Sequence, residues 1–254
     1  MNRLLILFLL CGIDICAWSK NYKYERIKNV AYKKVDDQLL NLDVYVPEGD
    51  GPFPSILVVH GGAWRLGSKG QLAIYARSLA KRGYTCFAIN YRLAPKFKSP
   101  AQTEDCRDAI RWIRTNASKY KANPDLIGAM GYSAGGHLVS MLATTGLTKE
   151  SDPKGIGTKI IAAVAGGAPT DFRTVRKKSN ALSYWFGAER NTEPEAYEAD
   201  SPNAFVDKGD SPIFFYNGSV DLLVHPDKHP MVGFRGPIAL YESLKKVNVD
   251  TGLY

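Results

Sequence analysis

The stretch Gly131-Tyr132-Ser133-Ala134-Gly135-Gly136 decides the expected fold of this chain. An apolar run at residues 126–130 precedes it, and residues 137–142 continue with the character of a helix. Glycines two residues before and after Ser133 allow the backbone to turn sharply without a Cβ clash. The pattern predicts a strand, a tight turn that exposes the serine hydroxyl, and a helix that begins directly after it.

A serine in such a turn is a candidate nucleophile, but a free hydroxyl is weakly reactive. It needs a base to take its proton and N–H groups to stabilise the negative oxygen that forms on the substrate. The alternative interpretation of Ser133 is a helix start that is rich in small residues. The strand before it and the helix after it favour the catalytic interpretation.

A second glycine motif supplies the expected oxyanion hole. His60-Gly61-Gly62-Ala63-Trp64 directly follows the apolar run at residues 54–59. We expect backbone N–H groups of Gly61, Gly62 or Ala63 to act together with that of Ala134, and the sequence leaves open which of the first three donates. We predict that His60 shapes this loop by hydrogen bonding and is not the base. A plain glycine turn after a strand is the alternative.

Strand-like and helix-like segments alternate along the rest of the chain. This order predicts an α/β fold of the α/β-hydrolase type, with a mostly parallel sheet, right-handed crossovers and helices on both faces. A leading hairpin is expected to turn at residues 36–37. Strands are expected at residues 26–34, 39–46, 54–59, 84–90, 126–132, 159–165, 213–217 and 249–254, and helices at 71–81, 101–119, 137–142 and 238–247. In the first helix, the residues expected to face the core are Leu72, Tyr75, Ala76, Leu79 and Ala80.

Residues 170–210 interrupt this alternation. The segment is rich in aromatic residues, among them Tyr184, Trp185, Phe186 and Tyr197. We predict a partly helical insertion that lies over the strand ends and forms a lid or a pocket wall. The alternative is a simple surface excursion.

The first 19 residues have the pattern of a secretory signal peptide. Arg3 precedes an apolar run at residues 4–12, and small residues at Ala17 and Ser19 predict cleavage after Ser19. A buried strand or a membrane anchor is the alternative, but the run is short for a bilayer. Residues 20–254 then form one domain, expected to be secreted or periplasmic and without stable membrane insertion.

Composition excludes several other classes of protein. The chain has 254 residues, of which 45% are hydrophobic and 23% charged, as in an ordinary globular domain. Its net charge of +8 is scattered along the sequence, which argues against a nucleic-acid partner. No metal-ligand spacing and no phosphate-binding loop occurs, so we expect no cofactor. After signal cleavage Cys86 and Cys106 remain, and we expect buried thiols and no disulfide.

Four motifs in order carry a family resemblance. They are His60-Gly61-Gly62, Tyr-Arg-Leu-Ala-Pro at residues 91–95, the serine turn with His137, and Gly-Ser-Val-Asp-Leu-Leu-Val at residues 218–224. From residue 39 onward the chain resembles α/β-hydrolase serine esterases near the hormone-sensitive-lipase type, in the branch of secreted feruloyl and acetylxylan esterase-like proteins. Tyr132 stands where the lipase-type pattern usually has Asp, and Lys96 where it often has Glu.

The resemblance implies cleavage of carboxylic esters through an acyl-enzyme. Ser133 is the implied nucleophile and Asp221 the acid that orients the base, with Asp171 as the reserve candidate. The implied substrate is a small ester or a polysaccharide that carries acetyl or feruloyl-type esters. A kynurenine-formamidase-like amide hydrolase and a non-catalytic or truncated member of the fold are the alternatives.

The general base is the difficulty. Among the four histidines, His137 is expected to point into packing, and His225 and His229 precede the helix at residues 238–247. In the family the base follows one further strand, so we infer that the chain ends a few residues short of it and lacks the final helix. A rewired base, with His225 or His229 turned toward Ser133, is the other explanation.

Overall fold

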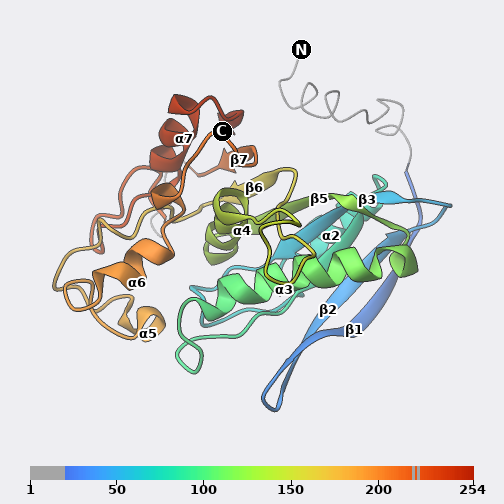
Figure 1. Cartoon of the computed structure of the whole chain (residues 1–254), viewed down its shortest axis with the longest axis horizontal. Helices are drawn as coiled ribbons and strands as arrows, with labels where there is room; N and C mark the ends of the chain where they lie inside the picture. Colours follow the sequence, from blue (N-terminus) through green and yellow to red (C-terminus); the bar gives the residue numbers. More distant parts are fainter. Residues whose placement is uncertain (1–20, 219–220, 222–223) are drawn as a thin grey trace.

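The computed structural model describes residues 21–218, 221 and 224–254, so the predicted signal peptide lies outside the described residues. Within them, one eight-stranded sheet has the order β1-β2-β4-β3-β5-β6-β7-β8 (Figure 1). β2 is antiparallel to both of its neighbours, and the other strand pairs are parallel. The strands are β1 Tyr24–Val35, β2 Gln38–Pro47, β3 Phe53–Val59, β4 Thr85–Ile89, β5 Ala122–Tyr132, β6 Ala163–Gly166, β7 Ile213–Tyr216 and β8 Thr251–Leu253. The predicted hairpin and the mostly parallel sheet are confirmed.

Helices cover both faces of the sheet, as predicted. On one face α2 (Ala73–Ala80) packs Ala76 and Ala80 against Tyr45 and Cys86. On the other face the helices share one large apolar core with the opposite side of the strands. These are α3 Ala101–Asn116, followed by the short 3₁₀ helix η2 Ala117–Tyr120, α4 Ala134–Thr145 and α7 Pro237–Lys246. Burial of these apolar surfaces is the main source of stability of the fold.

Two details of the prediction are wrong. β6 begins at Ala163, four residues later than expected: the Lys159 N–H donates to Leu147 O outside the sheet, and Ile161 bonds Ile127 O of β5 only singly, before the regular ladder begins. Tyr75 is 46% exposed, because the side of α2 that meets the sheet is formed by alanines and Tyr75 turns away from them. Both errors arise from tertiary packing, which the periodicity of apolar residues in the sequence does not reveal.

The insertion between β6 and β7 contains three short helices, so its partly helical character is confirmed. They are α5 Ser183–Phe186, α6 Pro194–Ala199 and the 3₁₀ helix η3 Pro202–Ala204. In Figure 1 the segment (orange) lies at one side of the molecule, with the β1–β2 hairpin (blue) at the other. Trp185 and Tyr197 are fully buried, so the insertion packs firmly onto the domain. Its role as a lid stays a prediction.

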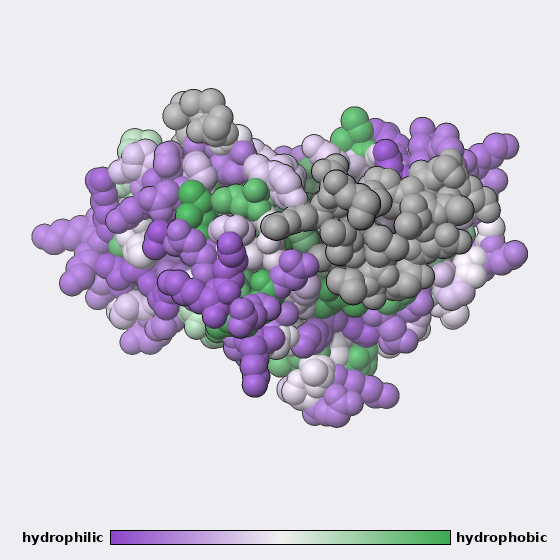
Figure 2. All heavy atoms as spheres, turned by 90° about the horizontal axis from the view of Figure 1, so that it is seen from above, coloured by the Kyte–Doolittle hydropathy of each residue, from purple (hydrophilic) through white to green (hydrophobic). Residues whose placement is uncertain are grey.

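Both described cysteines are buried free thiols, as predicted, and burial raises the pKa of Cys86 and of Cys106. The face in Figure 2 is mostly hydrophilic, with apolar side chains in small separate patches. Among the described residues, no helix combines the length and the apolar character needed to span a bilayer.

Asp105 joins three parts of the fold. It is fully buried at the start of α3, where its carboxylate accepts hydrogen bonds from Lys33 Nζ of β1 at 2.6 Å and from the backbone N–H of Arg92 at 2.8 Å. The Arg92 guanidinium adds an ion pair at 2.8 Å. Lys33 Nζ also pairs with Asp108 at 2.7 Å, whereas Asp105 is the one carboxylate that pairs with the half-buried Arg92 among the described residues.

We expect Asp105→Asn to lower the free energy of unfolding by about 3 kcal/mol, because it leaves the half-buried Arg92 guanidinium without its counter-charge. Urea unfolding followed by circular dichroism measures this. Asp125→Asn is the matched control, since Asp125 is 87% exposed and lies 3.8 Å from Arg114. Equal stability losses in the two variants would contradict the prediction.

Candidate active site

Ser133 sits at a strained turn between β5 and α4. Its φ of 55° and ψ of −121° form a conformation that non-glycine residues rarely adopt, at a cost of about 1–3 kcal/mol. The Ser133 N–H donates to Gly166 O at 2.7 Å, and the Ser133 carbonyl accepts from His137 N at 3.0 Å. The hydroxyl forms no hydrogen bond within the described part of the chain. The turn therefore leaves the Ser133 hydroxyl free for a substrate.

The glycines around Ser133 are required by close backbone contacts. A Cβ on Gly135 would lie 2.1 Å from Val59 O, and one on Gly131 would lie 2.3 Å from Gly135 O. A Cβ on Gly136 would lie 2.6 Å from Gly166 O. The turn thus packs its bare backbone against the carboxyl ends of β3 and β6.

The predicted oxyanion loop lies beside the serine. A Cβ on Gly61 would be 3.3 Å from Ser133 Cβ, so the two backbones run side by side. Gly62 has a φ of 112° and accepts hydrogen bonds at its carbonyl, which closes a turn. The N–H groups of Gly61, Gly62, Ala63 and Ala134 have no acceptor among the described residues. Ala134 is also the first residue of α4, where the helix dipole favours negative charge.

An aromatic stack holds this loop in place. Ala63 and Trp64 both have positive φ, 50° and 58°. The Trp64 ring stacks on Trp185 of the insertion at 3.7 Å with an interplanar angle of 4°. Tyr184 Oη donates to Ala63 O at 3.0 Å, and Ala94 N–H donates to Trp64 O at 2.9 Å. These contacts compensate the backbone strain, and the sequence analysis did not identify them.

His137 packs in the interior, as predicted. It is fully buried, accepts a hydrogen bond at Nδ1 from Trp64 Nε1 at 3.1 Å, and donates from Nε2 to Asp200 O at 2.8 Å. Burial lowers the pKa of His137 to about 4, so the ring is neutral near pH 7. It supports Trp64 and is not the base.

His60 shapes the oxyanion loop, also as predicted. Its Nδ1–H donates to Gly61 O at 2.7 Å, and its ring stacks on Tyr91 at 4.1 Å. Tyr91 Oη donates to His60 O at 3.0 Å. Burial lowers the pKa of His60 to about 4.

Asp221 lies at the same edge of the sheet as Ser133. Its Oδ1 accepts from Val224 N–H at 2.9 Å, and its Oδ2 lies 3.4 Å from the hydroxyl of Tyr132, the residue before the serine. A Cβ on Gly167 would be 3.3 Å from Oδ2, so the end of β6 leaves room for this carboxylate. The structure thus brings the predicted acid toward the serine turn.

The reserve candidate, Asp171, has other partners. It forms an ion pair with Arg173 at 2.8 Å and accepts from Asn203 Nδ2 at 3.1 Å. These contacts hold its carboxylate within the insertion.

Neither candidate for a rewired base contacts the serine. The Nδ1 atoms of His225 and His229 accept hydrogen bonds from backbone N–H groups two and three residues later. An accepting Nδ1 carries no proton, whereas the base of a triad donates from Nδ1 to the acid. No described histidine forms a hydrogen bond with Ser133. The position of the base therefore stays a prediction.

Tyr132, the residue before Ser133, interacts with Tyr216 and Tyr75, and the sequence analysis assigned none of these three tyrosines to the site. The rings of Tyr132 and Tyr216 lie 6.1 Å apart, and Tyr132 is 42% exposed. Burial raises the pKa of Tyr216 to about 12, with smaller contributions from Tyr75 and Tyr132. Among the described residues, no cluster of His, Cys, Asp and Glu has the arrangement of a metal site.

A model of one protein family matches residues 42–232, which include every candidate residue named above. The chain belongs to the BD-FAE family. Its members are α/β-hydrolase esterases.

Individual proteins agree with this assignment. Esterase LipC of Mycobacterium tuberculosis is 28% identical over 83% of this chain and 55% of its own length. The chain spans about half the length of the curated relatives it matches.

Solved structures share the fold. An esterase from Thermogutta terrifontis matches with a TM-score of 0.71 and 26% identity, over 92% of this chain and 80% of that one. A truncated carbohydrate esterase from gut microbiota matches with a TM-score of 0.72 and 24% identity, over 92% and 87% of the two chains.

We expect Gly135→Ala to destabilise the protein by about 3 kcal/mol, because the new Cβ would collide with two backbone carbonyls that cannot move independently. Thermal and urea unfolding measure the effect. Gly70→Ala is the control, since its Cβ would meet only Ser68 Oγ at 3.7 Å. A stable Gly135→Ala variant would show that the turn has a different geometry.

We expect the rings of His60 and His137 to remain neutral between pH 5 and pH 8, because burial lowers the pKa of each to about 4. Ring ¹³C and ¹⁵N chemical shifts followed by NMR across this range measure protonation. A titration of either ring with a midpoint above pH 6 contradicts the burial that the structure gives them.

Proposed function

We propose that this protein hydrolyses carboxylic esters with Ser133 as the nucleophile. The observation that carries the proposal is the placement of the strained, unbonded Ser133 beside the free N–H groups of Gly61–Ala63 and Ala134. Acyl transfer requires this combination, since the negative charge of the tetrahedral intermediate must be stabilised as it forms. Membership of an esterase family supports the same reaction.

In the proposed reaction Ser133 Oγ attacks the ester carbonyl carbon and loses its proton to an imidazole. The carbonyl oxygen becomes an oxyanion, which accepts hydrogen bonds from Ala134 N–H and from the Gly61–Ala63 loop. Collapse of the intermediate expels the alcohol, which takes the proton from the imidazolium. Water then hydrolyses the acyl-enzyme by the same steps, and Asp221 stabilises the imidazolium throughout.

The pairing of β8 with β7 indicates where a histidine that follows Tyr254 would lie. Tyr254 N–H donates to Phe215 O at 3.0 Å, and Asn217 N–H donates to Tyr254 O at 3.0 Å. These bonds place Tyr254 alongside the end of β7, from which the loop of Asp221 starts. A histidine a few residues after Tyr254 would therefore lie at the edge of the sheet that carries Asp221, in accordance with the order serine, acid, histidine.

We further propose acetyl or feruloyl-type esters on a plant polysaccharide as the substrate, with export to the periplasm or the medium. The exposed tyrosines near Ser133 support an aromatic acyl group, because aryl rings stack favourably on them. The signal-peptide pattern at residues 1–19, outside the described residues, supports export, since such a polymer is too large to enter a cell.

We expect Ser133→Ala to remove hydrolysis of p-nitrophenyl acetate and labelling by a fluorophosphonate probe, because both reactions need the serine oxygen. Ser118→Ala is the matched control. Ser118 is an exposed serine that lies before the start of β5, whereas Ser133 follows the end of the same strand. Equal activity of the Ser133→Ala variant and the parent protein would refute the proposed nucleophile.

The same assay decides between the two explanations for the base. If the 254-residue chain is active and His225→Ala or His229→Ala removes that activity, the base is rewired. If the chain is inactive and an extension that carries a histidine beyond β8 restores activity, the base follows Tyr254.

A further inference from the structure

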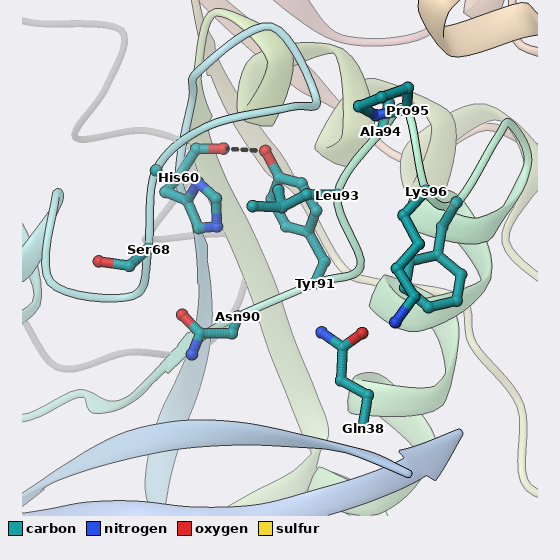
Figure 3. Close-up of a pocket in the computed structure, with 11 residues that line it drawn as sticks. Gln38, His60, Ser68, Asn90, Tyr91, Leu93, Ala94, Pro95 and Lys96 are labelled. Carbon is teal, nitrogen blue, oxygen red and sulfur yellow. Dashed lines mark hydrogen bonds between the residues drawn. The ribbon is translucent and has the colours of Figure 1, made fainter. Parts of the chain in front are cut away.

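A cavity of about 600 Å³ lies next to the oxyanion loop and contains neither Ser133 nor Asp221. Its walls come from the end of β3, the segment after β4 and the turn of the β1–β2 hairpin (Figure 3). His60 and Gly67 belong both to the cavity and to the loop at residues 60–67. The cavity thus adjoins the proposed active site without being part of it.

Several polar groups of this cavity have no partner in the described part of the chain. The Gln38 side-chain amide forms no hydrogen bond there, and neither does the Nδ2 group of Asn90, whose Oδ1 accepts from Lys69 N–H at 2.8 Å. Lys96 Nζ lies 5.1 Å from the Phe97 ring, and no described carboxylate pairs with it. Figure 3 shows the Gln38 amide and the Lys96 ammonium approaching the same space from opposite walls.

His60 adds an acceptor at the inner end. Because its Nδ1–H donates to Gly61 O, its Nε2 carries a lone pair. That atom has no donor among the described residues, and His60, which lines the cavity, is otherwise buried, with only 2% of its surface exposed in all. A ligand hydroxyl can donate to Nε2, since the imidazole is held neutral by a pKa of about 4.

The lining favours one class of ligand. Amide groups and a neutral imidazole suit a molecule with several hydroxyls, and the side chains of Leu93, Pro95 and Phe97 offer apolar surface to its C–H groups. None of the described lining residues carries a carboxylate, and Lys96 supplies a positive charge. A polyhydroxylated anion fits this combination better than a cation or an apolar molecule.

We propose that the cavity is an accessory site for an acidic saccharide, a sugar residue that bears a carboxylate, such as a uronic acid of a polysaccharide. The choice of a saccharide among polyhydroxylated acids rests on the proposed function. The carboxylate pairs with Lys96 Nζ, the amides of Gln38 and Asn90 bond ring hydroxyls, and one hydroxyl donates to His60 Nε2. The site holds an acidic polymer beside the serine turn.

Calorimetric titration of the Ser133→Ala protein tests this without any need for turnover. The probes are xylotetraose that carries one glucuronic acid branch and unbranched xylotetraose. We expect the branched compound to bind more tightly, and Lys96→Met in the same background to weaken it about five-fold, the upper end for an exposed ion pair. Lys96→Met leaves the affinity for unbranched xylotetraose unchanged, and Gln38→Ala weakens both compounds.

Lys208→Met is the matched control. Lys208 is also an exposed lysine, but it lies before the start of β7, at the amino ends of the parallel strands and away from the cavity. Loss of the preference for the branched compound in Lys96→Met alone supports the proposal. Equal binding of the two compounds by the parent, no binding of either, or equal effects of Lys96→Met and Lys208→Met overturns it. A failure of ester hydrolysis leaves these titrations unaffected, so the two proposals are tested separately.

Discussion

The contact between the bare backbone of the serine turn and the end of β3 is the constraint on which the rest of the site depends. A Cβ at Gly135 would come within 2.1 Å of Val59 O, so α4 begins as close to β3 as two backbones can lie. That closeness places Gly61 beside Ser133 and brings two sets of N–H groups to one point. Neither set alone forms an oxyanion hole, and the contact that assembles them involves no side chain.

The oxyanion loop obtains its shape from the insertion. Ala63 and Trp64 adopt positive φ, which residues with a Cβ avoid unless other contacts compensate. Trp185 supplies a stacked partner for Trp64, and Tyr184 bonds the Ala63 carbonyl. The insertion therefore acts on the site as a support for the loop, through residues more than a hundred positions away in the sequence.

The parts that sequence predicts well are those whose chemistry is local. Glycine spacing around Ser133 predicts the turn because the backbone there tolerates no Cβ, and the apolar run before His60 predicts a central strand. The prediction that Tyr75 faces the core was wrong. The amphipathic pattern of α2 does not show that its contact face is narrow and formed by alanines alone. The stack of Trp64 on Trp185 and the cavity beside His60 join segments far apart in the chain, and no local pattern encodes such pairs.

His137 and Asp200, which lie around the Trp64 stack, contribute to the free energy of unfolding with opposite dependence on pH. Burial lowers the pKa of His137 from 6.5 to about 4, so its contribution to stability is full above pH 6.5 and is lost as pH falls toward 4. Burial raises the pKa of Asp200 from 3.8 to about 7, so its contribution is full at low pH and is lost as pH rises toward 7. Asp200 accepts from Ser99 and Thr103 through its carboxyl group, while its carbonyl holds the His137 ring. Between pH 4 and pH 6.5 the two contributions change in opposite directions, so the free energy of unfolding varies less with pH than either group alone would make it.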